Sequence, residues 1–306
     1  MEGRKEVPPL SNATDAPIFT RERGLEIIRK LRLMDDNFMK VCFENNIPAV
    51  SYVLHIILAD KALRILSVKT EYVVSSLHGR GVRFDIFATD SEGRLYDIEI
   101  QRSDRGAGQR RARLNSSLLD ANALQKGMSA EQLPETYVIF ITEQDVLGSG
   151  LPIYHVDRSI AETGQSFGDA AHIIYVNGAY DGDDPLGRLM RDFRASDPAA
   201  MADSPLRDTV RHFKETEKGV SSMCKELEKI VEEAETKGME KGMEKGMEKG
   251  MEKGMEKGMA TGIEKGMATG RLAQLHDLVK KGLLTLSTAA REAGMTEDAF
   301  RKAAML

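Results

Sequence analysis

Apolar and polar side chains alternate most regularly in two neighbouring segments, residues 82–88 and 94–101. A period of two, with β-branched and aromatic residues on one face, predicts β-strands. The residues between the segments include Asp90-Ser91-Glu92-Gly93, which is typical of a tight turn, and Gly93 suits the left-handed position of a three-residue hairpin loop. The pattern therefore predicts an antiparallel hairpin in which Asp85 faces Glu99.

Other patterns predict the remaining elements. Helical periodicity predicts helices over residues 25–33, 37–43, 51–62, 107–126 and 185–193 and a long charged helix over 203–235. Apolar runs predict strands over residues 63–74, 137–142 and 172–176, with a further edge strand over 151–156. Asp36 precedes an apolar-periodic segment and is expected to cap the helix over 37–43. Residues 1–20 are polar and are predicted to be disordered.

From Gly238 to Thr269 the chain repeats every four residues, with five identical GMEK units followed by GMAT, GIEK and GMAT. On a helix, a four-residue repeat drifts by about 40° per unit, so the methionine stripe winds around the axis. This period exceeds those that sustain supercoils. Each glycine costs about 1 kcal/mol relative to alanine. Residues 238–270 are therefore predicted to form a weak helix or a flexible linker between the charged helix of residues 201–237 and the C-terminal segment.

The segment after the repeats, residues 271–306, is predicted to form a small helical module. Ser287 and Thr296 are plausible helix N-caps, and Gly294 lies where the helix between them would end. Two short helices around Gly294 resemble a helix-turn-helix. The second helix carries as many acidic as basic residues, which favours a packing or oligomerisation unit and hence a homo-oligomer formed through the C-terminal helices.

Composition sets broad limits on the protein. Apolar residues make up 41% of 306 residues, enough for a sizeable core, and the formal net charge of −5 does not indicate a nucleic-acid binder, although a local basic patch can still bind DNA. Cys42 and Cys224 form no metal-binding or disulfide pattern, which favours the reducing cytoplasm. The N-terminal residues lack the apolar segment of a secretory signal. Residues 47–59 are too short and polar to span a membrane.

The hairpin carries the candidate chemistry. Asp85 and Glu99 would lie with Cβ atoms roughly 4.5–5.5 Å apart, and like charges placed opposite each other destabilise a sheet unless a cation compensates them. Mg²⁺ prefers oxygen ligands and usually takes one or two carboxylates together with substrate phosphate. Gln101 lies on the same face. Asp97 shares this face too and would either reach a second ion or be exposed to solvent. The alternative for the whole face is a solvated edge hairpin.

A basic cluster follows the hairpin. Its members are Arg102, Arg105, Arg110, Arg111 and Arg113. Guanidinium groups match phosphate oxygens in pairs of hydrogen bonds. We therefore predict that Arg111, Arg102 and Arg113 contact a DNA backbone. The alternative is an ordinary solvated helix face.

The segment GRGVRFDIFATDSEGRLYDIEIQ resembles the metal-site hairpin of the PD-(D/E)XK nuclease superfamily and, more narrowly, the PD-(D/E)XK nuclease family transposases, also described as recombination-promoting nucleases. The resemblance extends from about residue 33 to 194 through the blocks RRARLNSSLLDANAL, LPETYVIFITEQDVLG and HIIYVNGAYDGDDPLGRLMRDF. It implies an α/β fold over residues 21–200, a restriction-endonuclease-like core with a central mixed sheet flanked by helices, followed by the helical C-terminal tail.

The resemblance also implies roles for individual residues. Asp85 corresponds to the first acid of the motif and Glu99 to the second, with the backbone carbonyl of Ile100 as a further metal ligand. Glu44 lies on a preceding helix, where such enzymes often place an additional acid. Gln101 stands where the superfamily usually has lysine, so it supplies a neutral amide in place of a positive charge.

The resemblance predicts a metal-dependent DNA endonuclease associated with recombination or transposition, with Mg²⁺ as cofactor and Mn²⁺ as the alternative ion. Because Gln101 replaces lysine, the alternative hypothesis of a catalytically inactive, DNA-binding protein of the same fold stays open. A third hypothesis is an interaction protein whose tail mediates assembly.

Overall fold

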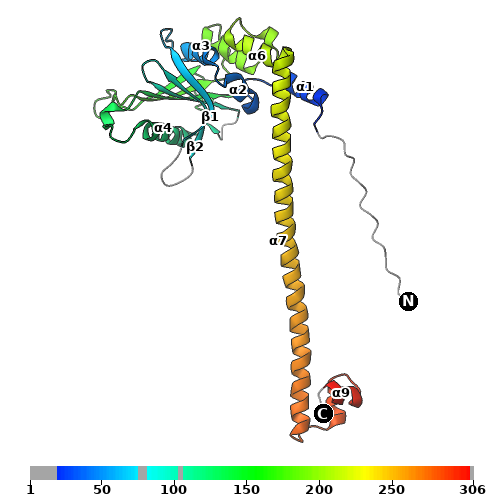
Figure 1. Cartoon of the computed structure of the whole chain (residues 1–306). Helices are drawn as coiled ribbons and strands as arrows, with labels where there is room; N and C mark the ends of the chain where they lie inside the picture. The colour runs from blue at the N-terminus through cyan, green and yellow to red at the C-terminus, as the bar shows by residue number, and fades with distance from the viewer. Residues whose placement is uncertain (1–18, 75–80, 103–105, 304–306) are drawn as a thin grey trace. The chain divides into compact units, whose positions relative to one another are not determined.

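The computed structural model describes residues 19–74, 81–102 and 106–303 (Figure 1). The chain divides into two compact units, which meet in the sequence at Val231 and Glu232. The predicted disordered segment over residues 1–20 lies, except for its last two residues, outside the described residues. Arg105 of the basic cluster also lies outside them.

The first unit is built on a six-stranded mixed sheet with the strand order β1-β2-β3-β4-β6-β5. The strands are β1 (Ile65–Val74), β2 (Val82–Asp90), β3 (Leu95–Gln101), β4 (Thr136–Thr142), β5 (Ile153–Val156) and β6 (Ala171–Asn177). Neighbouring strands from β1 to β3 are antiparallel, β3, β4 and β6 are parallel, and β5 is an antiparallel edge strand. The α/β fold with a mixed sheet is therefore confirmed and is consistent with a restriction-endonuclease-like fold.

The predicted hairpin is present in the predicted register. Ile86 pairs with Ile98 and Ala88 with Tyr96, so Asp85 comes opposite Glu99. Gly93 has a φ of 81°, the left-handed conformation that the loop requires.

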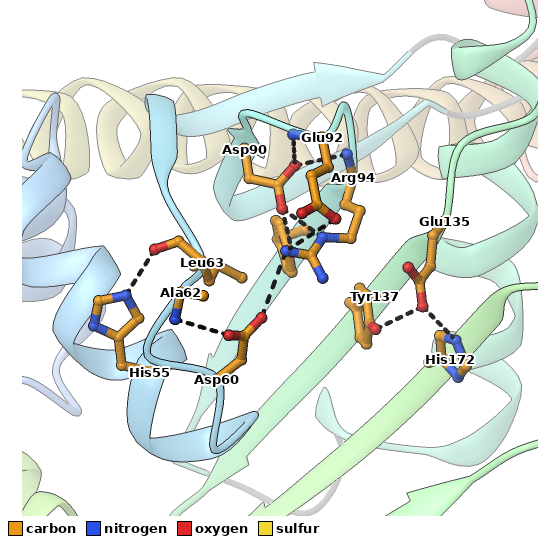
Figure 2. A network of polar contacts seen from close by, with 11 residues as sticks. His55, Asp60, Ala62, Leu63, Asp90, Glu92, Arg94, Glu135, Tyr137 and His172 are labelled. Atoms are coloured by element: carbon orange, nitrogen blue, oxygen red, sulfur yellow. Dashed lines mark hydrogen bonds and ion pairs between the residues drawn. The ribbon is translucent and has the colours of Figure 1, made fainter.

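The turn is held by the buried carboxylate of Asp90 (Figure 2). Its two oxygens accept hydrogen bonds from the backbone amides of Glu92 and Arg94, both at 2.9 Å, from Arg94 Nε at 2.5 Å and from the Tyr96 hydroxyl at 2.9 Å. Because Asp90 ends β2 and its donors lie in the loop and at the start of β3, Asp90 stabilises the loop length that sets the register of β2 against β3.

Helices cover both faces of the sheet. The helices of the first unit are α1 (Arg21–Lys30), α2 (Asp36–Phe43), α3 (Ile47–Ile57), α4 (Gln109–Ala123), α5 (Pro185–Arg194), α6 (Pro205–Glu215) and the beginning of α7 (Glu217–Lys280). The larger core packs α1–α3, α5, α6 and the beginning of α7 against one face, and the smaller core packs α4 against the other. The helix predicted over 51–62 begins earlier, at Ile47, because the Asn46 side chain caps it by accepting from the Ala49 amide.

The prediction of a single charged helix over 203–235 is wrong, because two helices, α6 and α7, meet at Thr216. The backbone there is extended, and the Thr216 hydroxyl accepts from the Gly219 amide. A Cβ atom on Gly219 would overlap the backbone of His212, so this junction requires glycine. The helix α7 then continues without a break through the tetrapeptide repeats, which selects the helical alternative over a flexible linker.

The second unit ends in α8 (Leu286–Glu292) and α9 (Glu297–Ala303). Ala289, Ala290 and Phe300 form its small core, packed against the end of α7. Thr285 caps α8 in place of the predicted Ser287, whereas Thr296 accepts from the Ala299 amide as expected. Within the described residues, no helix combines the length and apolar character that crossing a bilayer requires.

Candidate active site

The acidic residues of the hairpin converge with Gln101 where β3 ends. Asp85 Oδ2 accepts from the Ile100 amide at 3.1 Å, and Glu99 Oε1 accepts from the Asp85 amide at 3.4 Å. Gln101 Nε2 lies between the two carboxylates, 3.4 Å from Asp85 Oδ2 and 3.3 Å from Glu99 Oε2. Both acids therefore present oxygens to one point, as the predicted register requires.

Arg111 of α4 completes this cluster. Its Nη2 atom donates to Glu99 Oε2 at 2.6 Å, and its side chain is 38% exposed, whereas the Glu99 side chain is fully buried. Glu99 is thus paired from the α4 side, and the guanidinium group connects the buried carboxylate to the surface.

The spacing of α4 along β3 explains why Arg111 reaches Glu99. One helical turn further on, Asn115 Nδ2 donates to Asp97 Oδ2 at 2.9 Å. Four helical residues advance about 6 Å, and two strand residues advance about 6.6 Å. Because these lengths agree, the Arg111–Glu99 and Asn115–Asp97 pairs both form when α4 runs antiparallel to β3. The Tyr175 hydroxyl also donates to the Ala107 carbonyl at 3.0 Å, which holds the segment just before α4.

Asp97 is fully buried, so its predicted solvent-exposed alternative is wrong. Within the described part of the chain, its Oδ1 atom has no hydrogen-bond partner, and the same is true of Asn115 Oδ1. Burial, together with the charge of nearby Glu99, raises the pKa of Asp97 well above its usual value. A protonated Asp97 would give Oδ1 a hydrogen to donate, which removes the unpaired buried charge.

The two candidate metal ligands also titrate abnormally. Burial raises the pKa of Asp85 to about 6, and the Ile100 amide and Arg111 partly oppose this effect. Burial and the charge of Asp85 raise the pKa of Glu99 to about 7, and Arg111 partly opposes this rise. One guanidinium group thus does not fully compensate the two carboxylates. A bound cation would favour the ionised form of both acids.

The chemistry of this site fits a hard cation that takes few protein ligands. Among the described residues, no group of three or more histidine, cysteine, aspartate or glutamate side chains has the geometry of a metal site. Two carboxylates with room for phosphate and water are what Mg²⁺ usually takes.

An open cavity of about 570 Å³ lies beside Gln101. Its lining residues are Leu31, Asp35, Asp36, Asn37, Gln101, Arg102, Glu143 and Leu227. Arg102 is 53% exposed and is paired with Asp35 at 2.6 Å and with Glu143 at 3.7 Å. Of the cluster, Gln101 thus faces this cavity, with Arg102 at the cavity wall.

Glu44 is not part of this cluster. It lies at the C-terminal end of α2, where its carboxylate accepts from the Thr70 amide at 3.0 Å and contacts the Thr70 hydroxyl. It also lines a different cavity, next to Asn46 and Thr209. The N-terminal end of α2, about 12 Å away along the helix axis, is the end that approaches Gln101.

Arg113 lies about 200° around α4 from Arg111 and is exposed. The two side chains therefore lie on different faces of the helix. Of the three arginines predicted to contact phosphate, Arg111 touches the acidic cluster and Arg102 lines the adjoining cavity.

Asp36 is the acidic residue that the sequence patterns did not assign to the site. It lines the cavity with Gln101, and its charge raises the pKa of Asp85. The N-cap of α2 is Asp35, whose carboxylate accepts from the Arg32 amide at 2.7 Å and does not cap the helix. Two consecutive aspartates at a helix start are an ordinary capping signal. The sequence alone therefore gives no sign that Asp36 lies beside the acidic cluster.

A comparison with protein families finds a match for the part of the chain that carries this cluster. Residues 43–178 match the model of the PD-(D/E)XK nuclease family transposases. The matched range contains all six strands and the four clustered residues Asp85, Glu99, Gln101 and Arg111. No curated protein and no solved structure gives a significant match to the chain.

Proposed function

Because residues 43–178 carry the domain of the PD-(D/E)XK nuclease family transposases, which supports a nuclease or transposase function in general, we propose that this protein is a Mg²⁺-dependent DNA endonuclease acting in recombination or transposition. The observation that carries the proposal is the convergence of Asp85 and Glu99 on Gln101 beside an open cavity. The proposed partner is DNA, and the proposed compartment is the cytoplasm.

In this proposal Asp85 and Glu99 hold the metal ion. The Ile100 amide is directed at Asp85, and the N–H and C=O groups of one strand residue point to the same side. The Ile100 carbonyl can therefore serve as a third oxygen ligand. Bound Mg²⁺, or Mn²⁺ in its place, would polarise the scissile phosphate and lower the pKa of a bound water.

The remaining side chains position the substrate. Gln101 donates to both carboxylates and would turn its amide to the attacking water or to a phosphate oxygen. Arg111 would hold a phosphate through the exposed part of its guanidinium group, because only Nη2 contacts Glu99. Arg102 would exchange its contacts with Asp35 and Glu143 for the DNA backbone. Arg113 would contact the backbone further along, from another face of α4.

A second candidate function is DNA binding without cleavage. Gln101 carries no charge, so within the cluster Arg111 is the cation that contacts the acids, and it is already paired with Glu99. A site of this kind could retain affinity for phosphate after losing turnover.

Plasmid nicking separates these functions. Wild-type protein is expected to nick supercoiled DNA in Mg²⁺ or Mn²⁺ and not in EDTA, and Asp85→Asn and Glu99→Gln are expected to abolish nicking. Glu44→Gln is the matched control and should retain activity, because Glu44 contacts Thr70 outside the cluster. DNA binding by wild type without nicking in either ion would support the inactive alternative. Equal nicking by wild type and Asp85→Asn would exclude this metal site.

A further inference from the structure

The repeats on α7 form four parallel rows on one exposed helix. Every residue from 238 to 270 is exposed to solvent, and the apolar row is the most conspicuous part of this surface. Its members, Met239, Met243, Met247, Met251, Met255, Met259, Ile263 and Met267, are 53–72% exposed. An apolar row of this length that no described residue covers is typical of an interaction surface.

The glycine row is not required by packing within the chain. A Cβ atom added to any glycine from Gly238 to Gly270 would meet nothing within 4 Å. Each glycine nevertheless costs about 1 kcal/mol relative to alanine in a helix. Glycines spaced by four residues allow the backbone of a second helix to approach closely. The glycine row therefore favours contact with another helix.

The four-residue period also determines how two such helices would meet. Rows of side chains at i, i+4 form ridges inclined by about 26° to the helix axis, and two sets of these ridges interdigitate at a crossing angle of about −50°. The methionine row and the glycine row are neighbours on the surface, about 100° apart. The methionine ridge of one helix thus fits the shallow glycine groove of another. The contact is limited to the place where the helices cross, and the helices do not supercoil.

Charge selects the partner and its orientation. In each repeat the lysine row lies beyond the glycine row on one flank, and the glutamate row lies beyond the methionine row on the other. When two copies cross in parallel, each glutamate flank faces a lysine flank. When they cross antiparallel, like flanks face each other, which is unfavourable.

We propose that α7 crosses the same helix of a second copy of this chain at one place within residues 238–269, in parallel orientation, through the methionine and glycine rows. The pairing is independent of the nuclease proposal, because it uses no residue of the acidic cluster.

Sedimentation of the full chain tests the pairing. Wild type is expected to form a concentration-dependent dimer, and replacing Met243, Met247, Met251 and Met255 by glutamine, a good helix former, should abolish it. A variant with GMKE in place of every GMEK keeps opposite flanks complementary and should still dimerise. Variants with only glutamate or only lysine in both charged rows should each be monomeric and should dimerise when mixed. A monomeric wild type, or a dimer that survives the four methionine substitutions, would overturn the proposal.

Spin labels test the orientation. Met239→Cys and Met267→Cys, each in a Cys224→Ser background, place labels near the two ends of the repeat. In a parallel dimer, labels at the same position in both copies lie closer together than labels at 239 in one copy and 267 in the other. The reverse order of distances would show antiparallel pairing and contradict the charge argument.

Discussion

At the residue scale, the position of the Gln101 amide depends on a glycine. A Cβ atom on Gly106 would overlap Gln101 Oε1, whereas a Cβ atom on Gly108 would meet nothing within 4 Å. We expect Gly106→Ala to displace the amide and lower the nicking rate by about 100-fold, since displacements near 1 Å can cost that much. Gly108→Ala should retain the rate. Initial rates of plasmid nicking, with circular dichroism as the control for folding, measure the difference, and equal rates for both variants would contradict it.

The raised pKa values of Asp85 and Glu99 predict how stability depends on pH. Their ordinary values lie near 4, and in the folded protein they are about 6 and about 7. The folded state therefore binds more protons than the unfolded state between about pH 4 and 7, so these two groups lower the free energy of unfolding as pH rises.

A divalent ion should reverse this loss, because it binds the ionised carboxylates. We expect Mg²⁺ to raise the melting temperature more at pH 8 than at pH 5, and to have little effect at either pH on Asp85→Asn. Thermal unfolding in Mg²⁺ against EDTA measures both effects. A Mg²⁺ shift independent of pH would mean that the ion binds elsewhere.

The buried Asp97 gives a separate prediction. Its pKa is raised, so its ionised form destabilises the fold as pH rises above about 4. Asp97→Asn removes this penalty while keeping a hydrogen-bonding partner for Asn115, so its stability relative to wild type should increase with pH. Asp97→Ala leaves Asn115 unpaired and should cost about 1–3 kcal/mol. Urea unfolding at several pH values distinguishes the two. A constant difference between wild type and Asp97→Asn would exclude a titrating Asp97.

The sequence was sufficient to predict which acids meet on the hairpin, because alternation and turn length together determine the register. It was not sufficient for residues whose position depends on packing between distant elements. Glu44 and Asp36 lie at opposite ends of one helix, and only the docking of α2 on the sheet decides which end approaches Gln101. Asn115 reaches Asp97 through the placement of α4, which no local pattern encodes.

At the element scale, the hairpin depends on its turn. Asp90→Ala would leave the Tyr96 hydroxyl and the Arg94 guanidinium without their buried acceptor. We expect a loss of about 3 kcal/mol in the free energy of unfolding. Asp60→Ala removes another acid that pairs with Arg94, at 3.6 Å near the surface, and should cost less than about 1 kcal/mol. Chemical denaturation compares them, and equal losses would show that the turn does not depend on Asp90.

Strands were predicted closely and helix ends less well. The β-strands are bounded by clear turn residues, so β4 and β6 each differ from their predicted range by one or two residues. Helices α6 and α7 join at Thr216, a residue with no strong helix-breaking tendency, and their charged surfaces form one uninterrupted pattern. The break follows from the Thr216 hydroxyl, which accepts from the Gly219 amide, and from the close approach of Gly219 to the His212 backbone.

At the scale of the whole molecule, the larger core reaches into α7 but ends before the repeats. Val220, Met223 and Leu227 are buried in it, and the unit boundary follows at Val231. A chain ending after Val231 is therefore expected to unfold cooperatively at nearly the wild-type temperature. A chain ending after Thr216 should be strongly destabilised, because it loses these three side chains. Calorimetry of both truncations tests this, and similar melting temperatures would show that α7 adds nothing to the core.

The identical tetrapeptides on α7 also have a genetic consequence. Slippage during replication that gains or loses one unit keeps the reading frame and removes no residue from the hydrophobic core of either compact unit, since the repeat residues are all exposed. Each event lengthens or shortens the helix by about 6 Å and rotates its remaining C-terminal part by about 40° about the helix axis. Related genes are therefore expected to differ in this stretch by whole units of four codons, a variation that evolution can sample without refolding the protein.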